Sequence, residues 1–354
     1  IYIMSENNNI KEVKENNVDV ELYDRQIRLW GLSTQQLILS SKILLVNLNG
    51  LGTEIVKNLL LSGIGNITVL DDHEIDINDV NSYYNQFFIY KSDLSKLDST
   101  KKYKRLELAE ANMKDMNPKC NLQTITENTT KNLLNKEFLK QFDLVIITEI
   151  MESSLLCEVN NITRELNIPL YICQSFGLSS MIFIDYIKRE SILEKNLDAK
   201  KDIGQISRET ELIKKNDFPK SMTKNTDLIS KKLLDEEEGV FKLVSKTLHK
   251  YISFKELIDR IPDENLITSQ FNNRQTRQIL GNTTIPYILN HLNPATFKQD
   301  DHFNKCKGIE LPAVTAIMGA ALVQDFISSL NNAKVLDNLL LLDAQNDEMI
   351  VLEV

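Results

Sequence analysis

The sequence predicts an α/β protein with a doubly wound, Rossmann-like sheet. Short apolar runs, of the kind found in parallel strands buried on both faces, alternate with helix-length segments along most of the chain. The clearest unit begins with the apolar run 43–46, continues through a helix and ends with a second strand at Asp71. It spans about 30 residues, which is the length of one β-α-β unit.

The expected strands are apolar runs that end in polar or turn-forming residues. The run 43–46 leads into a turn rich in Asn and Gly, and the run 143–148 is the strongest of the later ones. Strands are predicted at 43–46, 67–70, 122–125, 143–148, 169–173, 181–187, 338–342 and 349–352.

The expected helices lie between these strands and have recognisable ends. Gly31 interrupts the first helix, and Ser33-Thr34-Gln35-Gln36 matches a capping box before the apolar residues 37–39. Asn117-Pro118 stops a later helix, and Leu311-Pro312 begins the last one, because proline is favoured in the first helical turn. Further helices are predicted at 23–29, 53–61, 98–116, 153–166 and 313–330.

The pattern changes at Lys188. Residues 188–238 are dominated by Lys, Glu, Asp and Asn, and the acidic run 235–238 is expected to be a solvated loop. Helical patches are expected at 243–252 and 276–289. We therefore predict a mobile N-terminal tail, one α/β domain formed by two separate segments, and a mostly helical insertion between them; the boundaries are 1–20 for the tail, 21–187 and 306–354 for the domain, and 188–305 for the insertion.

Composition excludes several classes of protein. The chain has 41 Lys and Arg against 50 Asp and Glu, a net charge of −9, which disfavours binding to nucleic acid. No apolar run approaches the roughly 20 residues of a membrane span, and no signal peptide is expected at the start. The four cysteines are scattered without a C-x-x-C pair, so we expect a reducing compartment and no metal site. Cys157 and Cys173 are expected in the core, and Cys306 is expected to be exposed.

The loop after the first strand is a degenerate form of the dinucleotide-binding loop G-x-G-x-x-G. Asn47 and Asn49 occupy the first two glycine positions, and of the glycines that follow, Gly50 and Gly52, only Gly52 matches the pattern. Asn tolerates a positive φ, so the turn can form, but its side chains crowd the place of a phosphate. Asp71 follows where a ribose-binding carboxylate is expected, about 20 residues on. These residues are compatible with two interpretations: a turn that binds no ligand, and a nucleotide site.

The segment 23–31 places Arg25 and Arg28 three residues apart on one helical face, with Asp24 four residues before Arg28. The two interpretations are a surface helix with one salt bridge and an arginine that faces a phosphate, for which the planar guanidinium is well suited.

Taken together, the segments 23–31, 50–54, 69–71 and 117–118 resemble the activating enzymes (E1) of ubiquitin-like proteins, a superfamily that includes bacterial sulfur-carrier adenylyltransferases. The resemblance is closest to the smaller, Aos1-type subunit of the SUMO-activating enzyme. Residues 307–314 and the helix through Gln324-Asp325 resemble that subunit's return into the adenylation fold. Over 188–304 the likeness is weak.

The chain also departs from the active halves of that family. Asn81 matches a family asparagine, but the arginine that should follow it is missing. His73 stands where active halves have a second Asp, and Thr148-Glu149 stands where they have an Asp after a strand. The resemblance therefore implies the inactive half of a heterodimer, whose larger, Uba2-type partner binds ATP and Mg²⁺ and carries the thioester cysteine.

The resemblance implies that the assembled enzyme adenylates the C-terminus of SUMO, passes it to the partner's cysteine, and meets the SUMO E2 through that partner. It implies that Arg25 reaches into the partner's ATP site, and that the enzyme is nuclear, with the cytoplasm as an alternative. Other hypotheses are the regulatory half of the NEDD8 E1, which is longer through its insertion, a pure scaffold, and an NAD-dependent dehydrogenase, which Asn47 and Asn49 disfavour.

Overall fold

The computed structural model describes residues 18–75, 87–90, 102–197, 232–233, 241–260, 310–333, 335–344 and 348–352. The acidic run 235–238, Asn81, Cys306 and the helix predicted at 276–289 lie outside these residues.

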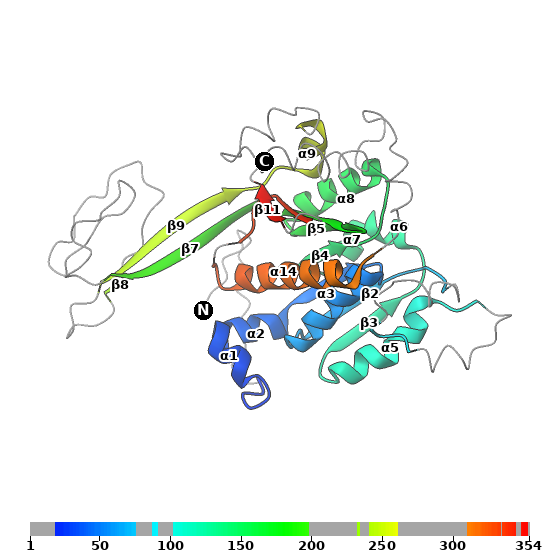
Figure 1. Ribbon diagram of the computed structural model, residues 1–354, viewed down its shortest axis with the longest axis horizontal. Helices are drawn as coiled ribbons and strands as arrows, with labels where there is room; N and C mark the ends of the chain where they lie inside the picture. The colour runs from blue at the N-terminus through cyan, green and yellow to red at the C-terminus, as the bar shows by residue number, and fades with distance from the viewer. Residues whose placement is uncertain are drawn as a thin grey trace.

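The core of the protein is an eight-stranded sheet in the order β11-β10-β6-β5-β4-β1-β2-β3 (Figure 1). Its five adjacent strands from β5 to β3 are parallel, while β6, β10 and β11 continue the sheet in antiparallel pairs. This parallel-dominated sheet confirms the predicted fold class. The strands are β1 Lys42–Val46, β2 Asn66–Leu70, β3 Asn121–Ile125, β4 Leu144–Ile147, β5 Leu170–Phe176, β6 Ser179–Asp185, β10 Leu339–Asp343 and β11 Glu348–Leu352.

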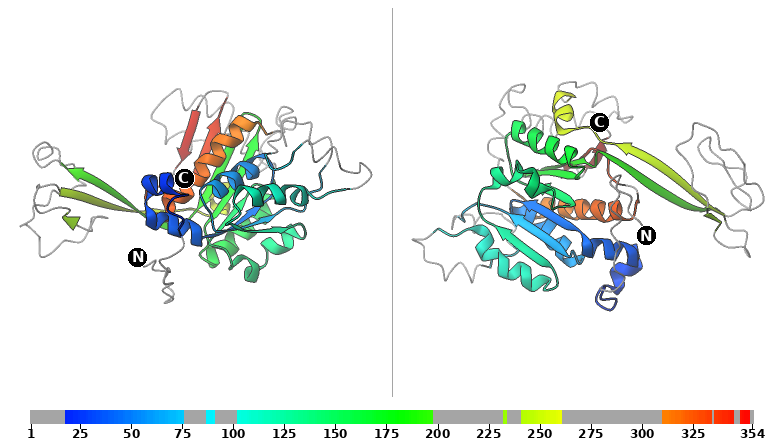
Figure 2. Two further views of the ribbon diagram at one scale, coloured as in Figure 1. Left: turned by 90° about the horizontal axis from the view of Figure 1, so that it is seen from below. Right: turned by 180° about the vertical axis from the view of Figure 1, so that it is seen from behind.

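Helices cover both faces of the sheet (Figure 2). Alternate residues of β1 enter different cores: Ile43 and Leu45 pack with α2, α3, α5 and α14, whereas Leu44 and Val46 pack with α6 to α9. The strands are therefore buried on both faces, which explains their uninterrupted apolar sequences. The helices are α1 Asp24–Trp30, α2 Leu32–Ser40, α3 Gly50–Leu61, α5 Arg105–Met116, α6 Thr129–Leu133, α7 Lys136–Leu139, α8 Ser153–Glu165, α9 Phe254–Arg260 and α14 Pro312–Leu330.

The helix α14 lies along α3. Gly319 permits this close approach, because a Cβ atom at that position would lie 2.9 Å from the Cβ of Glu54. The 19 residues of α14 are long and apolar enough to cross a membrane by length and composition, yet 56% of the most apolar window is buried inside the protein. In this structure α14 is accordingly a core helix.

Three helix starts differ from the prediction. The helix α2 begins at Leu32 with Gly31 as its N-cap, so Ser33 lies inside the helix and the predicted capping box is wrong. The helix α3 begins at Gly50 rather than Thr53. The helix α5 begins at Arg105, because residues 102–104 connect to the segment after β2, and Arg105 N donates to His73 O.

The described part of the insertion is a long antiparallel ribbon that projects from the domain (Figures 1 and 2). It consists of β7 Lys188–Leu197 and β9 Phe241–Lys250, with the short β8 Lys232–Leu233 beside β9. The helix predicted at 243–252 is therefore wrong, and most described residues of the insertion are in strands rather than helices. Lysines recur every four residues in 242–250. This spacing places side chains on one face of a helix and equally on one face of a strand, because four is a multiple of the strand period of two. Pairing with β7 makes the segment a strand.

Candidate functional site

A cavity of about 210 Å³ lies at the carboxyl ends of β1, β4 and β5. In open α/β sheets this is the edge at which ligands bind, where the strand order reverses. The cavity is lined by Asn47, Asn49, His73, Arg105, Thr148, Glu149, Ile150, Ser175 and Glu310.

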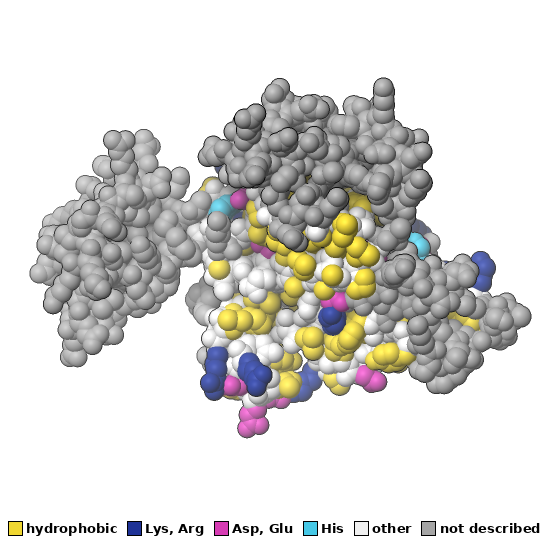
Figure 3. All heavy atoms as spheres, in the orientation of Figure 1, with side chains coloured by type: hydrophobic (Ala, Val, Ile, Leu, Met, Phe, Trp, Pro, Cys, Tyr) yellow, Lys and Arg dark blue, Asp and Glu magenta, His cyan; other side chains and the backbone are white. Residues whose placement is uncertain are grey.

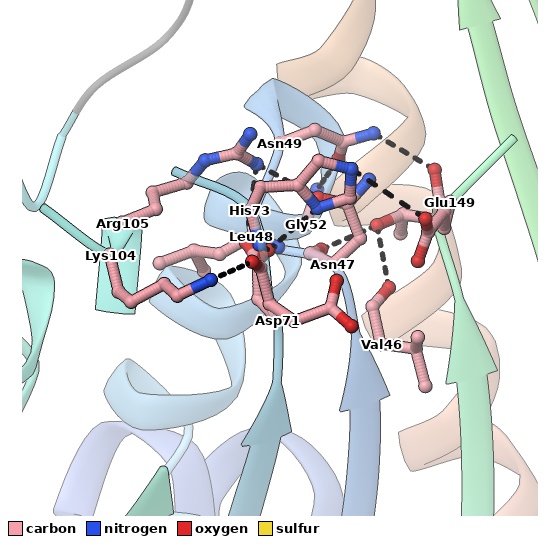
Figure 4. Close-up of polar contacts among 12 residues, drawn as sticks. Val46, Asn47, Leu48, Asn49, Gly52, Asp71, His73, Lys104, Arg105 and Glu149 are labelled. Carbon is pink, nitrogen blue, oxygen red and sulfur yellow. Dashed lines mark hydrogen bonds and ion pairs between the residues drawn. The ribbon is translucent and has the colours of Figure 1, made fainter. Parts of the chain in front are cut away.

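The turn between β1 and α3 is built by its two asparagines (Figure 4). Asn47 has a φ of 73°, in the left-handed region that Asn tolerates. Asn49 is the N-cap of α3: its Oδ1 accepts from Gly52 N at 2.8 Å, and its Nδ2 donates to Thr148 O at 2.9 Å. Gly52 is required because a Cβ there would lie 2.2 Å from Asn47 O. Gly52 therefore allows the start of α3 to pack directly against the backbone of Asn47.

Asp71 lies buried at the end of β2, and both its oxygens are engaged. Oδ2 accepts from Leu48 N at 2.9 Å and lies 3.2 Å from an Arg105 guanidinium nitrogen. Oδ1 accepts from His73 N at 2.9 Å and pairs with His73 Nδ1 at 2.8 Å. Burial acts to raise the pKa of Asp71, but the bonds from His73 and the charge of Arg105 outweigh it, and the pKa lies below its ordinary value.

Arg105 brings a guanidinium to the cavity, and His73 brings a titratable imidazole. Arg105 donates to Asn47 Oδ1 at 2.8 Å, so it connects the turn with Asp71. The hydrogen bond to Asp71 raises the pKa of His73, whose Nε2 lies 3.6 Å from Glu149. Burial raises the pKa of Glu149.

Glu310 enters the cavity from the segment that precedes α14. Its carboxylate accepts from Gly50 N at 2.6 Å and from Leu51 N at 3.1 Å, at the N-terminus of α3. Burial raises the pKa of this carboxyl group, and the two backbone hydrogen bonds oppose that rise.

These contacts decide whether a nucleotide fits. A dinucleotide or ATP would need free N–H groups at the start of α3 and a free carboxylate at Asp71. The side chains of Glu310, Asn49, His73 and Arg105 already bind these groups. The residues present therefore do not fit a nucleotide in the arrangement seen here.

Of the residues predicted for the loop, Asn47 and Asn49 line the cavity, and Gly50 and Gly52 lie in the first turn of α3. Asp71 is joined to the loop through Leu48 N. Sequence reasoning missed Arg105, Ser175 and Glu310. The predicted helix 98–116 contains Arg105 in its interior, whereas the observed α5 begins there. Glu310 follows Gly50 by 260 residues, so no local signal links it to the loop. Only its position just before Leu311-Pro312 could have suggested that it enters the sheet edge.

Arg25 lies elsewhere, on α1, and its side chain is exposed. Within the part of the chain that the structure describes, it has no hydrogen bond or ion pair. Arg28 Nε pairs with Asp24 at 3.0 Å, which confirms the predicted salt bridge. Arg25 is not among the residues that line the cavity of its own chain.

The cysteines belong to the fold rather than to this cavity. Cys173 is fully buried in β5, which confirms its predicted place in the core, whereas Cys157 and Cys120 are half-buried. Burial raises the pKa of Cys120 to about 11 and also raises that of Cys157. The described residues contain no group of three or more His, Cys, Asp or Glu that could hold a metal ion.

Comparison with known proteins gives consistent results. The ThiF family model matches residues 23–353. The chain is 33% identical to the DNA damage tolerance protein RHC31 of Saccharomyces cerevisiae over 91% of this chain and 95% of that protein. It is 25% identical to SUMO-activating enzyme subunit 1 of Dictyostelium discoideum over 92% of this chain and 90% of that protein. It is 33% identical to the NEDD8-activating enzyme E1 regulatory subunit of Gallus gallus, over 50% of this chain and 31% of that protein.

Proposed function

This chain belongs to the ThiF family, and we propose that it is the smaller, non-catalytic subunit of a heterodimeric SUMO-activating enzyme. The observation that carries the proposal is the alignment with SUMO-activating enzyme subunit 1 of Dictyostelium discoideum, which covers nearly the whole of both chains. The match to the NEDD8-activating subunit covers only 31% of that longer protein, which makes the NEDD8 enzyme the second candidate.

The internal contacts of the cavity support a non-catalytic role. Because the chain's own side chains bind the groups that a nucleotide would use, we propose that the larger, Uba2-type partner binds ATP and Mg²⁺. In the proposed reaction, a carboxylate oxygen at the C-terminus of SUMO attacks the α-phosphorus of ATP, and pyrophosphate leaves. A cysteine thiolate of the partner then attacks the acyl carbon and displaces AMP, and the SUMO E2 accepts the modifier from the partner.

The surface supports association with a partner chain. The exposed residues of α14 carry no charge; they are Pro312, Ala313, Ile317, Ala320 and Gln324. The exposed side chains of Leu29, Leu32 and Leu61 extend the apolar surface of the helices on this side of the sheet. Figure 3 shows hydrophobic side chains gathered on this face, over α14 and around it. Extended exposed apolar patches are typical of protein interfaces.

The last part of the proposal concerns Arg25. It is exposed on α1, one helical turn before the exposed Leu29. Since no described residue of its own chain binds Arg25, its side chain is available to contact a partner docked on these helices. We propose that its guanidinium contacts the phosphates of ATP in the partner's site, and that the complex is nuclear.

The test begins with co-purification of the tagged full chain from its native cells. We expect one stoichiometric partner that is larger, with an intact glycine-rich loop and a catalytic cysteine. The purified pair should catalyse SUMO-dependent ATP–pyrophosphate exchange, and the chain alone should not. Exchange that depends on NEDD8 instead of SUMO would establish the second candidate, and exchange by the chain alone would contradict a non-catalytic role.

A further inference from the structure

The first turn of α3 has an acceptor for every N–H group that lacks a partner within the helix. Gly52 N donates to Asn49 Oδ1 at 2.8 Å, and Thr53 N donates to Asn49 O at 2.8 Å. The two remaining groups, Gly50 N and Leu51 N, donate to the two oxygens of Glu310. A helix start commonly leaves such groups to water or to an anion, and the helix dipole favours negative charge there.

Glu310 is held tightly in this place. Its residue is only 5% exposed, and its backbone forms an isolated parallel bridge with Gly177, just after β5. A Cβ atom at position 50 would lie 2.7 Å from Glu310 Oε2, so Gly50 leaves room for this carboxylate. A buried charge is costly unless it is hydrogen-bonded, and the two N–H groups and the helix dipole meet that need.

The cavity that Glu310 lines also contains the buried hydroxyl group of Ser175. Ser175 is 5% exposed and lines the cavity, and its Oγ has no hydrogen-bond partner among the described residues. Buried hydroxyl groups are rarely left unpaired. Together with the backbone N–H groups of α3 and the guanidinium of Arg105, this hydroxyl provides donors for an anion larger than a carboxylate.

We propose that Glu310 is a built-in anion, whose carboxylate occupies the place at the N-terminus of α3 that a phosphate group would take. The anion site of the fold is thereby closed from inside, and it fastens the segment that returns from the insertion to the edge of the sheet. Removal of the carboxylate should reopen the site to phosphate-class anions. This proposal does not depend on the identity of the modifier or of the partner.

The test uses the full chain alone, so its outcome is separate from that of the proposed function. The variant Glu310→Ala removes the carboxylate, and Glu310→Gln keeps its size but not its charge. The matched control is Asp325→Ala, which removes a carboxylate that is equally buried, 4% exposed, but bound by tyrosine hydroxyls and one backbone N–H rather than by a helix start. The probe is inorganic pyrophosphate, compared with sodium chloride at equal ionic strength.

We expect pyrophosphate to raise the melting temperature of Glu310→Ala by about 2–5 °C in a saturable way, as a ligand specific to the folded state does. Pyrophosphate should leave the melting temperatures of the wild type, Glu310→Gln and Asp325→Ala unchanged, because a side chain at position 310 still fills the start of α3 in each of them. Calorimetric titration should detect pyrophosphate binding by Glu310→Ala only.

Two results would overturn the proposal: a folded Glu310→Ala chain that does not respond to pyrophosphate, or an equal response from Asp325→Ala. If Glu310→Ala does not fold in chloride, refolding in pyrophosphate should restore its yield, and failure to do so would count equally against the proposal.

Discussion

Arg25 and Arg28 lie three residues apart on α1 but have different surroundings. Arg28 is paired with Asp24, whereas the exposed Arg25 is not bound by any of the residues described. Only Arg25 is therefore free to act on a neighbouring molecule, and this difference makes Arg28 a natural control.

We expect Arg25→Ala to lower SUMO-dependent ATP–pyrophosphate exchange of the complex by about 10- to 1000-fold, the scale for one charge contact at a reacting phosphate. The heterodimer should remain assembled by size-exclusion chromatography, because one side chain is a small part of a large interface. Arg25→Lys should recover part of the rate, since Lys cannot donate two parallel hydrogen bonds. Arg28→Ala should retain exchange near the wild-type rate. Unchanged exchange by an intact Arg25→Ala complex would support the scaffold hypothesis.

We expect His73 to make the stability of the protein depend on pH. The hydrogen bond to Asp71 raises the pKa of His73, and the pKa of Asp71 is lowered, so the pair is charged in the folded state at mildly acidic pH. A raised folded-state pKa contributes stability that is fully present below the unfolded value of 6.5 and is lost as pH rises through the folded value.

The stability difference between the wild type and His73→Gln should therefore be larger at pH 5.5 than at pH 8.5, as measured by urea unfolding at each pH. His73 is 40% exposed, so solvent screens the pair and the change should be small, about 0.5–1 kcal/mol. A difference that grows from pH 5.5 to pH 8.5 would contradict the assignment.

At the scale of elements, one buried carboxylate connects α14 with the sheet and with the chain that follows it. Asp325 Oδ2 accepts from the hydroxyl of Tyr171 on β5 at 2.6 Å, and from the hydroxyl of Tyr186, just after β6, at 3.3 Å. Its Oδ1 accepts from Leu336 N at 2.6 Å. The two tyrosine hydroxyls also contact each other. One side chain thus fixes the position of α14 and the entry into β10.

Asp325→Ala should lower the free energy of unfolding by roughly 2–4 kcal/mol, because it removes the shared acceptor of the tyrosine hydroxyl pair and the acceptor of one backbone N–H. Chemical denaturation is the measurement. The neighbouring Gln324→Ala is the matched control: Gln324 is exposed on the same helix, and its replacement should change the free energy by less than about 0.5 kcal/mol. Equal effects of the two variants would show that the network does not anchor α14.

At the scale of the whole molecule, the three described cysteines are poorly suited to form a thioester. Cys173 is buried, and burial raises the pKa of Cys120, Cys157 and Cys173, which makes these thiols poor nucleophiles. The proposed thioester belongs to the partner.

We expect a chain with all four cysteines replaced by Ser or Ala to support thioester formation by the complex, provided that it folds. The replacement at Cys173 should cost roughly 1–3 kcal/mol of stability, because that side chain is fully buried. Non-reducing electrophoresis with labelled SUMO would locate the adduct. A reducible adduct on this chain would contradict the proposal.

The sequence determines much of the fold because it is locally consistent. The apolar runs 43–46 and 67–70 match β1 and β2 closely, and the α/β class follows from their alternation with helices. The Asn-containing loop and Asp71 also predict a degenerate dinucleotide-binding loop at the carboxyl end of the first strand. These features depend on residues close together in the chain, where strand and helix periods are directly visible.

The tertiary structure decides what the sequence leaves open. The segment 243–252 carries a spacing compatible with either a helix or a strand, and pairing with β7 makes it a strand. The N-terminus of α3 is occupied by Glu310, which is far from Gly50 in sequence and meets it because the segment before α14 returns to the sheet. Long-range contacts such as this one leave no local period or motif, so only the folded chain reveals that a carboxylate fills the start of α3.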